Sequence, residues 1–130
     1  MTIFSNSLIK NERLCLTKQI DRLFSDGRWL RGSHLKCIYL KVDDEQDSPV
    51  RVLFSVPKKI HRKAVARNLL KRRMRESYRV QKHLLYDILR ANNILLNVAF
   101  VYTSDEKILF GALDREIKQL LAQLASRMKH

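Results

Sequence analysis

The sequence predicts an α+β protein, a compact sandwich in which helices pack on one mixed β-sheet, in the order α-β-β-α-β-α. Alternating apolar residues indicate two strands, and a run that is apolar at nearly every position indicates a third that is covered on both faces. The expected strands are 34–42, 51–56 and 95–102. Apolar residues spaced three and four apart indicate helices at 18–26, 64–89 and 105–128. A short further strand fits near Trp29.

The length of 130 residues predicts a single domain, with residues 1–15 as a flexible arm. Its two cysteines, Cys15 and Cys37, form neither a disulfide framework nor a metal-binding spacing, so reduced thiols and a cytoplasmic location are expected. No apolar run approaches the ~18 residues that span a membrane. No membrane partner is therefore expected.

The first helix is expected to be capped by Thr17 and ended by Gly27. Ile20, Leu23 and Phe24 share one face of it, as residues that pack into the core would. Trp29, just beyond the helix, either covers the core or offers a ring on which a base stacks.

The strand at 34–42 has two different faces. One face carries Ile38, Leu40 and Val42, and the other carries Cys37, Tyr39 and Lys41. The second face mixes a small residue, a phenol and a cation, which suits a groove for an RNA strand; a half-exposed sheet face is the alternative. The acidic residues of 43–47 are consecutive, and they indicate a solvated turn rather than a metal site.

The positive charge of the protein is concentrated in residues 57–82. This segment holds eleven of the 26 Lys and Arg residues and one acid, Glu76, for a local net charge of +10 out of +13 in the whole chain. So much like charge in a short segment opposes folding by self-repulsion. A nucleic acid would relieve that repulsion, so the sequence predicts a polyanionic partner.

Taken as a helix with about 100° per residue, residues 64–89 separate apolar from basic side chains. The apolar side carries Ala66, Leu70, Met74, Tyr78, Leu85 and Ile88. The opposite side carries Asn68, Arg72, Arg75 and Arg79, with Lys71 at its margin and Arg67 near the apolar boundary. Guanidinium forks pair bidentately with phosphate. A solvated basic face is the alternative, but one acid cannot neutralise the row by intrahelical pairs.

The loop before this helix adds cations that would contact phosphates and position the RNA without reading its sequence. They are Lys58, Lys59, Arg62 and Lys63. The four histidines show no metal-ligand spacing, and no nucleophile or phosphate-loop motif is present. His61 is expected at the surface. The residues therefore predict an RNA-binding protein without catalytic residues or a metal site of its own. A general or ribosome-associated RNA-binding protein and an independent metal-dependent nuclease remain alternatives.

Residues 63–76, KAVARNLLKRRMRE, closely resemble the signature of the bacterial ribonuclease P protein subunit. That family carries an Arg-Asn pair, then Lys-Arg, then Arg-Glu on one helix, after a strand that ends in a Lys-Lys pair. The resemblance covers nearly the whole chain. Leu69 replaces a residue that is often basic in the family, and Ile20 replaces a common aromatic.

The resemblance implies that the catalyst is an RNA, which also holds the Mg²⁺, and that one protein binds each RNA. The holoenzyme removes the 5′ leader of precursor tRNA by hydrolysis. A left-handed βαβ crossover is implied for the fold. The side chains facing the catalytic RNA would be Arg67, Asn68, Lys71, Arg72 and Arg75, extended by Arg79, Arg62 and Lys63. Those facing the leader would be Ile20, Phe24 and Tyr39, with Lys58 and Lys59 beside the groove.

Overall fold

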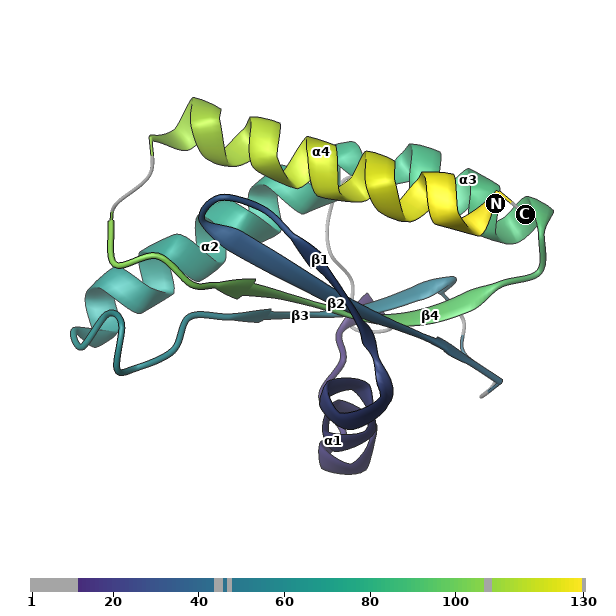
Figure 1. The fold of residues 1–130 in the computed structure, drawn as a ribbon, viewed down its shortest axis with the longest axis horizontal. Coiled ribbons are helices and arrows are strands. Elements are labelled where there is room, and N and C mark those ends of the chain that lie inside the picture. The colour runs from purple at the N-terminus through teal and green to yellow at the C-terminus, as the bar shows by residue number, and fades with distance from the viewer. Residues whose placement is uncertain (1–11, 44–45, 47, 107–108, 130) are drawn as a thin grey trace.

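The computed structural model describes residues 12–43, 46, 48–106 and 109–129, and these residues form a three-layer arrangement (Figure 1). Helices α2, α3 and α4 cover one face of a four-stranded sheet, and α1 lies alone against the other face. The elements are α1 (Thr17–Asp26), β1 (Arg28–Arg31), β2 (Leu35–Val42), β3 (Val50–Ser55), α2 (Ala64–Gln81), α3 (His83–Ala91), β4 (Leu95–Tyr102) and α4 (Phe110–Met128). The predicted α+β class is confirmed, and β1 is the further strand expected near Trp29.

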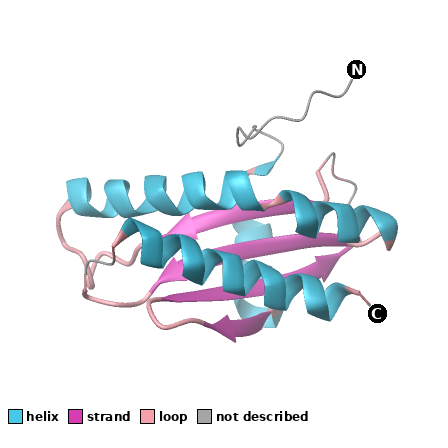
Figure 2. Ribbon diagram, turned by 90° about the horizontal axis from the view of Figure 1, so that it is seen from above, coloured by secondary structure: helices cyan, strands magenta, loops and turns pink. Residues whose placement is uncertain are grey.

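The sheet is mixed, with the strand order β1-β2-β4-β3. β2 runs antiparallel to both β1 and β4, whereas β3 and β4 are parallel neighbours joined through α2 and α3. Figure 2, seen from the helix side, shows that this crossover is left-handed. About 98% of such connections are right-handed. The hand matches what the resemblance implies.

The larger core fills the space between the sheet and the three helices. Its centre is a set of aromatic rings: the Phe54 ring stacks on Phe100 at 5.7 Å between centroids and meets Tyr78 edge-on at 5.6 Å. A smaller core beneath α1 contains Leu14, Leu23, Ile38 and Ala99. Both cores use β4, so the predicted burial of that strand on two faces is confirmed.

The apolar side of α2 is buried as its spacing predicts, with Leu70, Met74 and Tyr78 in the larger core. The helix predicted over 64–89 changes direction at Lys82, where α2 ends, and continues as α3. α3 ends at Ala91, and two residues later Asn93 has a φ of 53°, in the left-handed region that asparagine tolerates.

A buried ion pair ties the chain before α1 to this change of direction. The Lys82 ammonium donates to both carboxylate oxygens of Glu12 at 2.9 and 2.8 Å, and both side chains are at most 6% exposed. The Tyr86 hydroxyl donates to the same carboxylate at 2.6 Å. Burial, followed by this hydrogen bond, raises the pKa of Tyr86.

The segment between Glu12 and α1 is fixed to the edge of the sheet. The backbone N–H of Leu14 donates to the Val52 carbonyl at 2.9 Å, and the Leu14 side chain is buried. The prediction of a flexible arm over residues 1–15 is therefore wrong for 12–15, because an ion pair and a strand edge hold them. Residues 1–11 of that arm lie outside the described residues.

Two helix starts differ from the predictions. Thr17 is the first residue of α1 rather than its cap; the N-cap position is Leu16, and no side chain caps the helix there. α4 begins at Phe110 rather than at 105. The Ser104 hydroxyl instead accepts a hydrogen bond from the Glu106 N–H at 3.1 Å, which forms a local turn.

We expect Lys82→Met to lower the free energy of unfolding by about 3–5 kcal/mol, because the Glu12 carboxylate would stay buried without its cation. Urea denaturation followed by circular dichroism measures the change. The double variant Glu12→Gln/Lys82→Met removes both charges and should recover part of the loss. Equal stability of Lys82→Met and the parent would show that the pair does not hold the segment in place.

Candidate nucleic-acid interface

The exposed side of α2 presents the predicted basic row. Asn68 and Arg72 are exposed, and the remaining members of the row are half-buried at its flank. Arg72 has an ion-pair contact with Glu76 at 4.0 Å, and both side chains are largely open to solvent, so screening leaves that pair little strength. The structure thus brings together on one side of the helix Asn68, Lys71, Arg72, Arg75 and Arg79.

Arg67 differs from this row because its guanidinium is already used within the protein. Its Nη1 donates to the carbonyl oxygens of His61 at 3.0 Å and Arg62 at 2.7 Å. His61 is 7% exposed, and its Nε2 lies 2.9 Å from the Ser104 carbonyl oxygen, so the expected surface position of His61 is wrong. Together these contacts hold the crossover loop before α2 in one shape.

The anchored loop displays the predicted phosphate-binding cations. The side chains of Lys58, Lys59, Arg62 and Lys63 are all exposed. The turn that carries them is closed by the N–H groups of Ile60 and His61, which both donate to the Pro57 carbonyl. The loop is therefore rigid at its base and charged at its surface.

A cavity of about 350 Å³ continues the basic row around the β3 edge of the sheet. It lies between α2 and the segment that precedes α1. Three cations line it, Arg13, Lys71 and Arg75, and none of the described residues that line it is an acid. Arg13 was not among the predicted site residues, since a single cation in an expected arm carries no pattern.

The three side chains of α1 whose place was left open take different positions. Leu23 is fully buried, and Ile20 packs half-buried against the smaller core. Phe24 is 39% exposed, and its ring lies 6.0 Å from the ring of Trp29, which is 43% exposed. Trp29 therefore lies at the surface beside Phe24, and it does not cover the core.

A strip of the sheet beside α1 is left open. The strand register aligns four side chains across all four strands on the α1 side: Arg31, Lys36, Val101 and Ser55. Each is exposed or half-buried. The Lys36 ammonium lies 6.0 Å from the centre of the Trp29 ring. This open strip therefore combines exposed sheet, two cations and two nearby rings.

Tyr39 does not lie on that side. Tyr39 and Cys37 are buried beneath the three helices, and burial strongly raises the pKa of the Cys37 thiol. The predicted groove for an RNA strand is therefore wrong for Cys37 and Tyr39, because the alternation separates two faces without telling which one three helices cover; Lys41, at the end of this face, is exposed. The face with Ile38 and Leu40 is the one beside α1. Lys36 could have indicated the open face from the sequence, because it is one residue before Cys37 and therefore lies on the opposite face of β2.

The described residues contain no group of three or more His, Cys, Asp or Glu side chains placed to hold a metal ion. Within the described part of the chain, no helix has the length and apolar character needed to cross a membrane.

A basic helix beside an open sheet face with exposed rings defines a class of RNA-binding α+β protein. Comparison with known proteins identifies it further, because the family described as Ribonuclease P matches residues 8–125. The ribonuclease P protein component of Porphyromonas gingivalis is 36% identical over 121 residues, which are 93% of this chain and 88% of the relative. The chain belongs to the bacterial ribonuclease P protein family.

Solved structures agree with this assignment at the level of the fold. The ribonuclease P protein of Staphylococcus aureus superposes with a TM-score of 0.69 at 18% identity, covering 87% of this chain and 94% of that one. The protein from Thermotoga maritima gives 0.68 at 23% identity, covering 86% and 96%. The left-handed α+β sandwich is thus shared at low sequence identity.

The function of the protein follows from its membership of this family. The protein is the non-catalytic subunit of an endoribonuclease that matures the 5′ end of tRNA, it binds RNA, and its partner is the RNA of ribonuclease P. The reaction depends on that RNA. The expectation of an RNA-binding protein is confirmed.

We expect Arg67→Ala to lower the free energy of unfolding by about 1–2 kcal/mol, since two loop carbonyls lose a charged donor. Arg72→Ala is the matched control, and we expect it to change stability by less than about 0.5 kcal/mol because Arg72 is exposed. Urea denaturation of both variants distinguishes them. Equal stabilities would mean that Arg67 does not hold the loop.

Proposed function

We propose that the basic row of α2 and the crossover loop bind the catalytic RNA, while the open strip beside α1 binds the single-stranded 5′ leader of precursor tRNA. The observation that carries this proposal is the continuity of the two surfaces. The open strip ends at Ser55, the last residue of β3, and the loop cations begin three residues later at Lys58. Two RNA segments would therefore meet at the crossover loop.

The chemistry of the row suits phosphates. Arginines rise along α2 roughly once per turn, and each offers a planar fork to phosphate oxygens. Asn68, in their midst, can read a base edge or a 2′-hydroxyl. Arg62 and Lys63 extend the row into the loop, and Arg67 contributes mainly by holding that loop.

The chemistry of the open strip suits a single strand. Phe24 and Trp29 offer rings on which bases stack without sequence preference, each stack worth ~1–3 kcal/mol. Lys36 and Arg31 supply charge for the backbone, with Lys58 and Lys59 beside the end of the strip. Ile20 packs against the smaller core and has no ring on which a base could stack. Tyr39 is buried on the other face of the sheet, so it is not part of the proposed leader surface.

In this proposal the 130 residues act as one RNA-binding domain, with one protein on each RNA in the cytoplasm. Mg²⁺ is held mainly by the RNA, whose phosphate oxygens are the ligands that this hard cation prefers. The protein supplies binding and positioning. Its own residues keep the leader extended beside the RNA that performs the hydrolysis.

We expect Arg72→Ala to weaken binding of the catalytic RNA and to reduce the slope of log K against log salt by about 0.7–0.9, the value for one phosphate contact. Lys118→Ala, on the exposed side of α4, is the matched control and should keep the parent slope. Filter binding over a salt series measures both. An unchanged slope in Arg72→Ala would remove Arg72 from the interface.

We expect Phe24→Ala to spare affinity for the catalytic RNA but to reduce the preference of the holoenzyme for precursor tRNA over mature tRNA by about 5–100-fold, the loss of one stacked base. Competition binding with the two tRNAs measures that preference. Phe24→Trp should keep most of it because the ring is retained. If all three proteins discriminate equally, Phe24 does not contact the leader.

A cleavage assay on precursor tRNA at low Mg²⁺ tests the proposal as a whole. It compares the protein alone, the catalytic RNA alone and both together. Cleavage that is much faster with both supports a protein that positions substrate on an RNA catalyst. Cleavage by the protein alone would reveal catalytic residues in this chain, and no effect of the protein would contradict its proposed role with the leader.

A further inference from the structure

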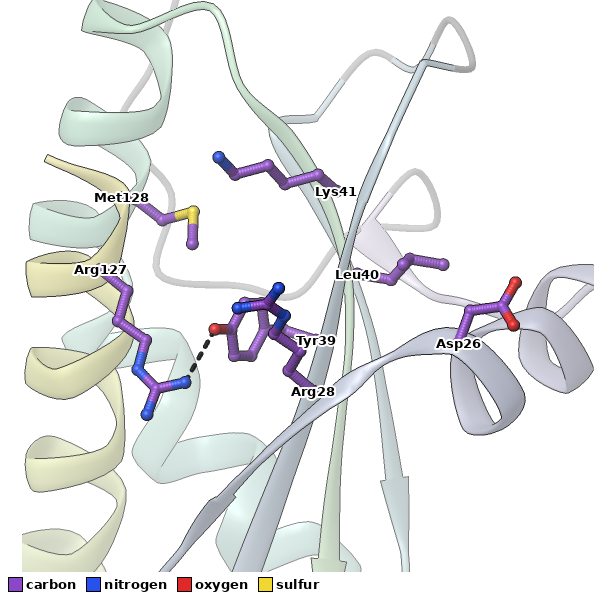
Figure 3. A pocket seen from close by; sticks show the side chains of 7 residues that line it. All are labelled: Asp26, Arg28, Tyr39, Leu40, Lys41, Arg127 and Met128. Carbon is purple, nitrogen blue, oxygen red and sulfur yellow. Dashed lines mark hydrogen bonds between the residues drawn. The ribbon is translucent and has the colours of Figure 1, made fainter. Parts of the chain in front are cut away.

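A cavity of about 710 Å³ lies at the edge of the sheet opposite β3 (Figure 3). β2 extends beyond the first residue of β1, Arg28, which pairs with Tyr39, and the end of α4 faces this free stretch of strand. The cavity opens here, away from both the basic row of α2 and the crossover loop. Nothing in the proposed function uses it.

Three cations from three different elements line the cavity. Arg28 and Lys41 come from β1 and β2, and their register places both side chains on the same face as Tyr39. Arg127 comes from α4, and its Nη1 donates to the Tyr39 hydroxyl oxygen at 2.9 Å. Figure 3 shows the three cationic side chains on the α4 side of β2, whereas Asp26 lies on the opposite side.

Among the described residues, few negative charges lie near these three cations to offset their positive charge. Of the described residues that line the cavity, Asp26 is the one acid against three cations, and none of Arg28, Lys41 and Arg127 forms an ion pair with a described residue. Their mutual repulsion opposes folding in the absence of a counter-charge. A bound anion would relieve it.

Tyr39 adds a positioned donor to the site. The side chain is 6% exposed, and its oxygen accepts the hydrogen bond from Arg127, so its own proton remains to be donated. The Arg127 guanidinium also lies 5.8 Å from the centre of the Tyr39 ring, so that ring orients the cation. The fold therefore holds a buried phenol and an oriented guanidinium in fixed positions, which a chance group of exposed cations would lack.

We propose that this cavity binds a phosphate group of RNA, and so forms a second RNA contact on the sheet edge opposite the basic row. Guanidinium forks and a hydroxyl donor match the tetrahedral oxygens of a phosphodiester. The site is open to solvent, as a phosphate within a chain requires. The inference rests on the proposed function only in taking RNA as the ligand. Because the two sites lie at opposite edges, they would hold different segments of RNA.

The test uses the full chain and its catalytic RNA. Arg28→Gln/Lys41→Gln removes two cations of the cavity, and Arg115→Gln/Lys118→Gln removes two exposed cations of α4 outside it, with the same change in net charge. Tyr39→Phe removes the hydroxyl and keeps the ring. We expect the cavity double variant to lose about 0.7–0.9 from the salt slope relative to the control, the value for one phosphate contact. Tyr39→Phe should weaken RNA binding several-fold with the slope unchanged.

The possible outcomes separate this inference from the proposed function. Equal slopes for the cavity and control variants overturn the inference, and if Arg72→Ala still lowers the slope in the same assay, the proposed role of α2 stands. If inorganic phosphate shifts the Arg127 side-chain resonances while RNA affinity is insensitive to the cavity variants, the site binds free phosphate, and the assignment to RNA is wrong. A reduced salt slope in the cavity double variant, with the parent slope kept in the control double variant, supports the inference.

Discussion

The buried pair between Glu12 and Lys82 is the interaction on which the arrangement of the molecule depends. It joins residues 70 positions apart in the sequence, and it does so where α2 gives way to α3. Removing two charges from water is costly unless they meet in good geometry and satisfy further hydrogen bonds, here from Tyr86. The pair therefore requires one placement of the segment before α1, and that segment places α1 on the open face of the sheet.

The unequal covering of the sheet then creates the interface. Three helices bury most of one face, and the residues beneath them serve stability: the rings of Phe54, Tyr78 and Phe100 pack together. A single ten-residue helix covers the other face, too little to bury its whole width. Ile38 and Ala99 lie beneath it and are fully buried, whereas the open strip remains accessible. The same sheet is thus a core on one face and a binding platform on the other.

The basic segment divides its residues between folding and binding. Arg67 and His61 turn inward to the backbone carbonyls of the crossover loop and of Ser104, and they give the loop its shape. Arg72, exposed one turn further along α2, has no such task. Neighbouring residues of like charge therefore differ in role according to what lies within reach of each side chain. Charge alone does not distinguish them.

The amino-acid sequence by itself determined the elements and the nature of the partner. Apolar spacing located α2 and β4, and the concentration of charge in 57–82 indicated a polyanion, because both signals arise from residues close together in the chain. The signature around Arg67 and Asn68 added the family. These are properties of local sequence, and the structure and the comparisons confirm them.

Tertiary structure alone decided which surface each side chain reaches. Alternation in β2 predicted that Tyr39 and Ile38 lie on opposite faces of the strand. Only the packing of three helices decided that Tyr39 lies on the covered face and Ile38 on the face beside α1. Glu12 looked like part of an arm because its partner, Lys82, is distant in sequence. Arg28, Lys41 and Arg127 come together only where a strand edge meets the end of the last helix. Such contacts depend on how the chain folds back on itself, and no local pattern of residues records them.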